Sequence, residues 1–140
     1  DNIVAVVMQA FESAAAKLQQ SISLVVVFYS SPAASKLSSV IADRLTKAAP
    51  GAVIWGCSSQ SLMGVGQEIA QPCAASVLIL AGLSQPPIAF RVEFQPTGDG
   101  PSIFGLPDAL IDDPGMGSAM LLAADPFSFP MDLLFKRVAD

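Results

Sequence analysis

The sequence predicts an α/β fold in which a βαβ unit is followed by an antiparallel hairpin, giving a mixed sheet flanked by helices. Two short apolar runs, Leu24–Tyr29 and Ala52–Trp55, are rich in the β-branched and aromatic residues typical of buried strands. Between them, Ser35–Ala49 repeats apolar residues at helical spacing. Strands joined by a short helical crossover run parallel, with a right-handed connection.

A further helix is expected before this unit. Asp1 or Asn2 can cap its first turn. Apolar residues then recur at helical spacing through about Gln20, namely Val4, Val7, Met8, Phe11, Ala15 and Leu18. The polar residues around Ser21 end this helix, as Pro50–Gly51 ends the helix over Ser35–Ala49.

The predicted hairpin follows the second strand. Ala75–Leu83 is apolar throughout most of its length and is expected to form a buried strand. Ile88–Phe94 alternates apolar and polar residues, which is typical of a half-buried strand. Because only a short turn at Gln85–Pro87 separates the two runs, we expect them to pair antiparallel.

Two stretches are predicted to be loops. Ser58–Gly66 is polar and carries glycines, and residues 95–118 are rich in Gly and Pro. A loop as long as the second is uncommon within a compact domain and is often functional. Beyond it, Ala119–Ala123 is expected to be a short fifth strand. Pro130 then suits the first turn of a last helix, whose apolar face would comprise Met131, Leu134, Phe135 and Val138.

The composition indicates one domain over residues 1–140 that is part of a larger protein. Hydrophobic residues make up 52% of the chain and charged residues only 14%, against about 25% charged in a typical soluble domain. Between Ala48 and Phe90 the only charged residue is Glu68. A short chain keeps much of its surface exposed, so we expect other protein chains to cover apolar surface here.

Several partners are excluded by charge and run length. The net charge is −5 and the basic residues are scattered, which argues against nucleic acid. The longest apolar run, Ala74–Leu83, is about half of the roughly 20 residues that a membrane span needs. Two cysteines, Cys57 and Cys73, indicate reduced thiols rather than a disulfide framework. A cytoplasmic location is therefore expected, with the plastid stroma equally compatible.

No catalytic machinery is apparent. The chain has no histidine, which removes the Ser-His-Asp triad, the Cys-His dyad and the commonest transition-metal ligand. Gly56–Ser59 superficially resembles a nucleophile elbow, but Gln60 stands where that motif requires glycine. The aspartates of the Gly/Pro-rich segment lack calcium-loop spacing. We therefore expect no enzyme, no metal site and no cofactor.

A candidate ligand site follows the second predicted strand. Cys57, Ser58, Ser59 and Ser61 come just after its carboxyl end, where open α/β sheets bind ligands. Their hydroxyls and backbone N–H groups can hold a small polar or anionic molecule. The alternative is a turn whose serines satisfy their own backbone. Glu68 can likewise bind a ligand amine, or lie in water at a strand edge.

Four short motifs occur in a distinctive order and spacing. They are Leu24–Ser30 before a helix; Val53–Ser59; Met63–Gly64 with Glu68 and then Ala75–Leu78; and Leu121–Leu122 with Asp125–Pro130 before a helix. On these motifs the chain resembles the N-terminal part of a FIST domain, over roughly Leu24 to its last residue. FIST domains are regarded as sensory domains for small ligands, amino acids among the candidates, in bacterial signalling proteins and beside F-box domains.

The resemblance implies a non-catalytic domain that binds a small, amino-acid-like ligand. The residues predicted to bind it, from their position and chemistry, are Cys57, Ser58, Ser59, Ser61 and Glu68. The resemblance also implies a C-terminal FIST domain as a partner. Ser61 stands where the family usually has glycine, and the Gly/Pro-rich segment is unusual for it. The alternative is therefore a scaffold or interaction subunit of a larger assembly that has lost ligand binding.

Overall fold

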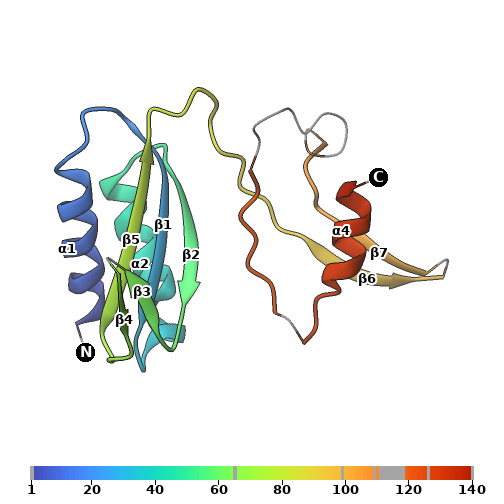
Figure 1. The fold of residues 1–140 in the computed structure, drawn as a ribbon, viewed down its shortest axis with the longest axis horizontal. Helices are drawn as coiled ribbons and strands as arrows, with labels where there is room; N and C mark the ends of the chain where they lie inside the picture. The colour runs from blue at the N-terminus through green and yellow to red at the C-terminus, as the bar shows by residue number, and fades with distance from the viewer. Residues whose placement is uncertain are drawn as a thin grey trace. The chain divides into compact units, whose positions relative to one another are not determined.

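The computed structural model describes residues 2–64, 66–98, 100–108, 110, 119–125 and 127–139. The chain forms two compact units, Asp1–Ile88 and Ala89–Asp140, whose elements are labelled in Figure 1. Each unit is described by itself. The single domain expected over 1–140 stays a prediction, because one domain can comprise two such units.

The first unit is built on a three-stranded mixed sheet. Strand β1 (Ile22–Ser30) lies in the centre, between β2 (Val53–Ser58) and β5 (Ala74–Ala81). β1 pairs parallel with β2 and antiparallel with β5. The parallel pair is joined by helix α2 (Ala34–Ala48), so the predicted βαβ unit and mixed sheet are confirmed.

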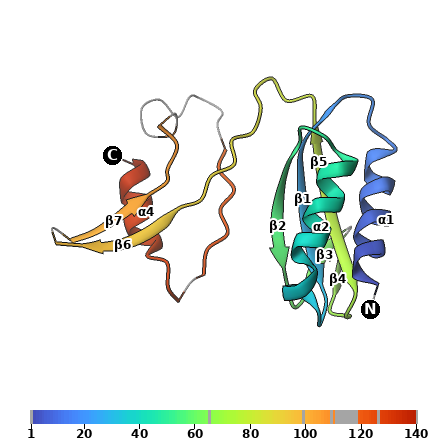
Figure 2. The same cartoon turned by 180° about the vertical axis from the view of Figure 1, so that it is seen from behind.

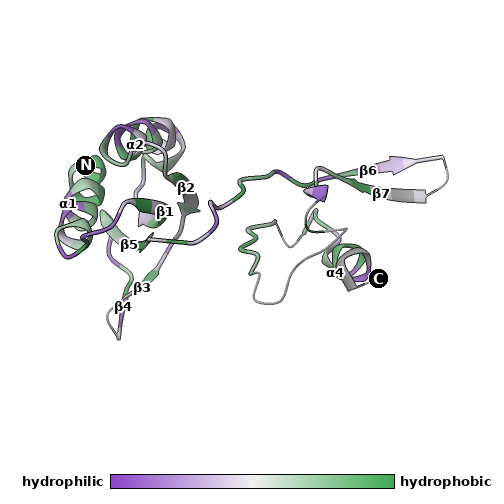
Figure 3. Cartoon of the chain, turned by 90° about the horizontal axis from the view of Figure 1, so that it is seen from above, coloured by the Kyte–Doolittle hydropathy of each residue, from purple (hydrophilic) through white to green (hydrophobic). Residues whose placement is uncertain are grey.

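Two helices cover one face of this sheet. Helix α1 (Ile3–Ala15) contacts β5, and α2 contacts β2. In Figure 2, α2 lies in front of the strands, and in Figure 3 both helices lie on one side of them. Their apolar faces meet alternate residues of β1 in a core that includes Ile3, Val7, Phe11, Val25, Val27, Tyr29, Ile41 and Leu45. α1 ends at Ala15 rather than near the predicted Gln20, and Leu18, expected on its apolar face, is 36% exposed.

An antiparallel hairpin follows the βαβ unit, as the fold class predicts, but other residues form it. Strands β3 (Leu62–Gly64) and β4 (Gln67–Ile69) pair antiparallel, where a loop over Ser58–Gly66 was expected. Gly66 has a φ of 76°, a left-handed turn conformation that suits glycine. The loop prediction is wrong here because glycine serves a tight turn rather than a long loop.

The expected pairing of Ala75–Leu83 with Ile88–Phe94 is wrong. The antiparallel partner of β5 is β1, and no strand covers Ile88–Val92. By pairing with the central strand, β5 packs Ala75, Val77 and Ile79 against the core. Pairing with the next run along the chain would not bring these residues to the core. Strand β6 (Glu93–Thr97) pairs instead with β7 (Gly100–Phe104).

The described part of the second unit includes the β6–β7 hairpin and helix α4 (Met131–Ala139). The hairpin lies partly within the segment 95–118 that was expected to be a loop; residues 109 and 111–118 of that segment lie outside the described residues. No strand forms over Ala119–Ala123, contrary to prediction. The last helix is confirmed, with Leu134 buried, whereas Phe135 is exposed rather than packed.

Helix length and hydropathy bear on the question of a membrane span. Within the described part of the chain, no helix is long and apolar enough to cross a bilayer.

Candidate functional site

A cavity of about 400 Å³ lies between α2 and the carboxyl-terminal half of the parallel pair β1 and β2. Its apolar walls come from Val27 on β1, Ile54 on β2, and Ile41 and Ala42 on α2. Its other lining residues are Tyr29, Ser38, Gly56, Cys57 and Ser58. The cavity therefore combines a hydrophobic floor with a few hydroxyl groups, the usual composition of a small-molecule site.

Tyr29 and Ser38 form the polar wall. Tyr29 is only 4% exposed, and its hydroxyl donates to Ser38 Oγ over 3.0 Å. The Ser38 hydroxyl in turn donates to the Ala34 carbonyl over 2.7 Å. This short chain of hydrogen bonds ties the end of β1 to the first turns of α2 and holds both oxygens at the cavity.

Gly56 brings the strands close together at this position. It has a φ of 154°, and a Cβ built on it would lie 1.8 Å from the carbonyl oxygen of Val27. No side chain fits between these two backbones, so only glycine allows β2 to approach β1 here.

The structure brings two of the predicted site residues to the cavity. Cys57 and Ser58 both line it, and Cys57 carries a free thiol. Ser58 lies opposite Tyr29 in the parallel ladder. The expectation that ligand-accessible groups gather at the carboxyl end of β2 therefore matches the position of the cavity.

Ser59 and Ser61 form a turn just beyond it. The Ser59 N–H donates to the Tyr29 carbonyl over 2.8 Å, continuing the contact with β1. The Ser59 hydroxyl donates to the Ser61 carbonyl over 2.6 Å. This is the local arrangement that the sequence left open as an alternative, in which a serine satisfies its own backbone. Neither residue lines the cavity.

Glu68 lies on β4, opposite Met63, and is exposed. It is not among the residues that line the cavity, so the structure does not bring it together with Cys57 and Ser58 there. Within the described ranges, no group of three or more Asp, Glu, Cys or His residues could hold a metal ion.

Sequence reasoning missed Tyr29 and Ser38. Tyr29 is the only tyrosine of the chain and was assigned to the core of the first strand. A buried tyrosine hydroxyl needs a hydrogen-bond partner, and this requirement was the available signal. No comparable signal in the sequence identified Ser38, because the helical pattern of α2 does not show which exposed serine faces the end of β1.

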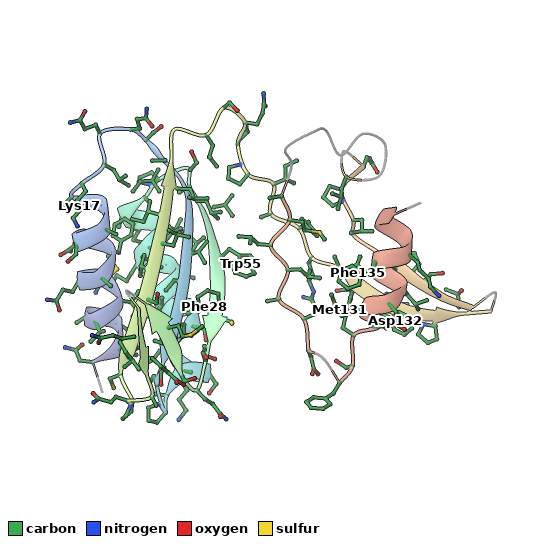
Figure 4. All side chains as sticks on the ribbon, viewed as in Figure 1. Lys17, Phe28, Trp55, Met131, Asp132 and Phe135 are labelled. Carbon is green, nitrogen blue, oxygen red and sulfur yellow. The ribbon has the colours of Figure 1, made fainter. Side chains whose placement is uncertain are left out.

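The opposite face of the sheet has a different character. Phe28 and Trp55 contact each other there edge to face, with ring centroids 5.9 Å apart and planes at 89° (Figure 4). Leu78 and Leu80 alternate along β5 with the core residues Val77 and Ile79 and remain 58% and 37% exposed. This face therefore presents apolar side chains to its surroundings.

The fold and cavity define a class: an α/β unit with a ligand-sized cavity at the carboxyl ends of its parallel strands. Comparison with models of protein families, with curated proteins and with solved structures finds no match for this chain.

Proposed function

We propose that the chain is a non-catalytic sensory module of the FIST type that binds a small ligand. The observation that carries this proposal is the cavity of about 400 Å³ beside Tyr29, Cys57 and Ser58. Its size lies within the range of about 300–1,000 Å³ common for small-molecule sites. Its position at the carboxyl ends of parallel strands is the usual one in open α/β sheets.

The chemistry of the cavity supports binding rather than turnover. The nucleophilic side chains on its helix-facing walls are hydroxyls, and the chain has no histidine to act as their base. Cys57 and Cys73 form no disulfide, which fits the proposed location in the cytoplasm or the plastid stroma.

Calorimetric titration with the common amino acids tests the proposal, since the resemblance implies this ligand class. Binding of at least one amino acid to the wild type is expected, with loss of binding in Ala42→Phe, which places a ring at the cavity. Ser39→Phe is the matched control, because Ser39 is exposed on the same helix without lining the cavity. Equal binding by both variants would exclude the cavity as the site.

Glu68→Gln tests the remaining predicted residue in the same titration. If the Glu68 carboxylate holds the ligand ammonium, affinity falls about tenfold or more in Glu68→Gln, the size of a lost charged hydrogen bond. Unchanged affinity would identify Glu68 as an ordinary surface carboxylate.

A second candidate function is a scaffold or interaction subunit. It is favoured by the apolar sheet face that carries Leu78 and Leu80. Its partner would be a C-terminal FIST domain or another protein chain that covers this face. In that case no ligand binds, and the chain associates through the sheet.

A further inference from the structure

The hydrogen atoms of the polar wall point away from the cavity. Tyr29 donates to Ser38, and Ser38 donates to the Ala34 carbonyl. Each hydroxyl has one hydrogen, so both are used within the protein. The phenolic oxygen itself keeps its acceptor lone pairs when it donates to Ser38. The buried phenolic oxygen therefore offers the cavity a lone pair and no proton.

The rest of the lining carries no formal charge. Val27, Ile41, Ile54, Ala42 and Gly56 are apolar, and Ser58 is a neutral hydroxyl that can donate or accept. A carboxylate ligand would face the Tyr29 and Ser38 oxygens with no lysine or arginine beside it. An ammonium group would lose its hydration without a carboxylate to replace it. Both charged forms are disfavoured in the same cavity.

We infer that the cavity selects an uncharged ligand that donates a hydrogen bond to Tyr29 Oη, and that Tyr29 is its specificity-determining residue. A primary amide on a small apolar body has this chemistry: its NH₂ donates to Tyr29, and its body packs on Ile41 and Ile54. An amino acid would fit only with its carboxylate and its ammonium group both outside the cavity and an uncharged side chain inside it. The inference rests on the proposed function and narrows its ligand class.

Three probes of one shape test the selectivity: benzamide, benzoate and benzylamine. Each is titrated at neutral pH into the ¹⁵N-labelled chain, and the backbone amide signals of Gly56, Cys57 and Ser58 are followed by NMR. Benzamide is expected to shift these signals saturably. Benzoate and benzylamine are expected to bind at least tenfold more weakly, because each brings an uncompensated charge to an uncharged lining.

Tyr29→Phe tests the assigned contact, since it keeps the ring and removes only the acceptor oxygen. Benzamide affinity is expected to fall about tenfold, the effect of one buried hydrogen bond. Ser38→Ala is a second variant at an exposed position and is expected to lower affinity in the same direction if Tyr29→Phe fails to fold. Ser39→Ala, exposed and away from the lining, should leave affinity unchanged.

The outcomes separate the two proposals. Equal or tighter binding of benzoate or benzylamine, or unchanged benzamide affinity in both Tyr29→Phe and Ser38→Ala, overturns the selectivity while leaving a ligand site in place. Failure of benzamide to shift these signals, when an amino acid does, also overturns the selectivity alone. Failure of every probe and every amino acid overturns the proposed function together with it.

Discussion

Single residues explain why the strands meet as they do beside the cavity. Gly56 lies where β2 approaches the Val27 backbone too closely for any side chain. Tyr29 closes the same region from β1 through its hydrogen bond to Ser38. The first effect depends on the missing Cβ of Gly56 and the second on the hydroxyl of Tyr29. A point mutation at either residue can therefore test it.

Gly56→Ala is expected to destabilise the chain by roughly 3 kcal/mol or more. The added methyl group would lie 1.8 Å from a backbone oxygen that cannot rotate away, and the φ of 154° disfavours any side chain. Urea unfolding followed by circular dichroism measures the loss.

Gly51→Ala is the matched control for this change. Gly51 has a φ of 83°, but a Cβ added to it would meet no atom within 4 Å, so the substitution brings strain without a clash. It should lose about 1–2 kcal/mol. If the two variants were equally stable, the close approach at Gly56 would have no energetic importance.

Asp125 organises the turn that leads into α4. Its carboxylate accepts the Phe127 N–H over 3.0 Å and the Ser128 hydroxyl over 2.7 Å. The hydrogen bond from the Phe127 backbone is the larger cause, and the one from the Ser128 hydroxyl adds to it. Together they hold the pKa of Asp125 below its ordinary value of 3.8. A lowered pKa means that the carboxylate stabilises the turn above pH 3.8, and that this contribution is lost as the pH falls through the folded-state value.

An NMR titration of the Asp125 carboxyl carbon checks this expectation. The wild-type midpoint should lie below 3.8. Ser128→Ala should move it upward, because one hydrogen bond to the charged form is removed. A wild-type midpoint at or above the ordinary value would contradict the described turn.

At the scale of elements, α2 is held by a narrow apolar face. Ile41 and Leu45 are buried against the sheet, while the neighbouring Val40 is 41% exposed. The helix has no side-chain N-cap hydrogen bond, so its stability depends largely on this packing rather than on its ends.

Leu45→Ala is expected to cost about 2–5 kcal/mol, the usual range for a leucine truncated in a core. Leu45 is 0% exposed, whereas Val40 is 41% exposed, so Val40→Ala on the same helix should change stability by less than about 1 kcal/mol. Chemical denaturation of both variants makes the comparison. Equal losses would mean that α2 does not pack through this face.

At the scale of the whole molecule, the stretch from Ala48 to Phe90, whose only charged residue is Glu68, is partly buried and partly exposed. Part of it forms β2 and β5 of the central sheet. Part remains exposed, including Met63, Leu78, Leu80 and Ile88. Scattered apolar exposure is ordinary in proteins, but neighbouring apolar residues on one sheet face indicate an interaction surface.

We therefore expect the chain to self-associate at high concentration and to bind a hydrophobic dye. Leu78→Lys, on the exposed sheet face, should weaken association, whereas Val40→Lys on the exposed side of α2 should not. Sedimentation velocity measures both. A wild type that stays monomeric and binds no dye would argue against the scaffold function.

The sequence alone determined the βαβ part of the first unit. β-branched runs at Leu24–Tyr29 and Ala52–Trp55, with helical periodicity between them, were sufficient to predict parallel strands and their connecting helix. The parallel order also located Cys57 and Ser58 at the carboxyl end of β2, where the structure has them. These features follow from short-range spacing, since the crossover leaves few alternative arrangements.

Only the tertiary structure decided which strands pair beyond that unit and which side chains line the cavity. β5 bonds to β1, far away along the chain, rather than to the run that follows it. The Tyr29–Ser38 hydrogen bond likewise depends on how α2 lies over β1. Periodicity shows which face of an element is apolar, but not which element will cover it. Strand pairing and the polar contacts of a cavity therefore emerge only when distant segments pack together.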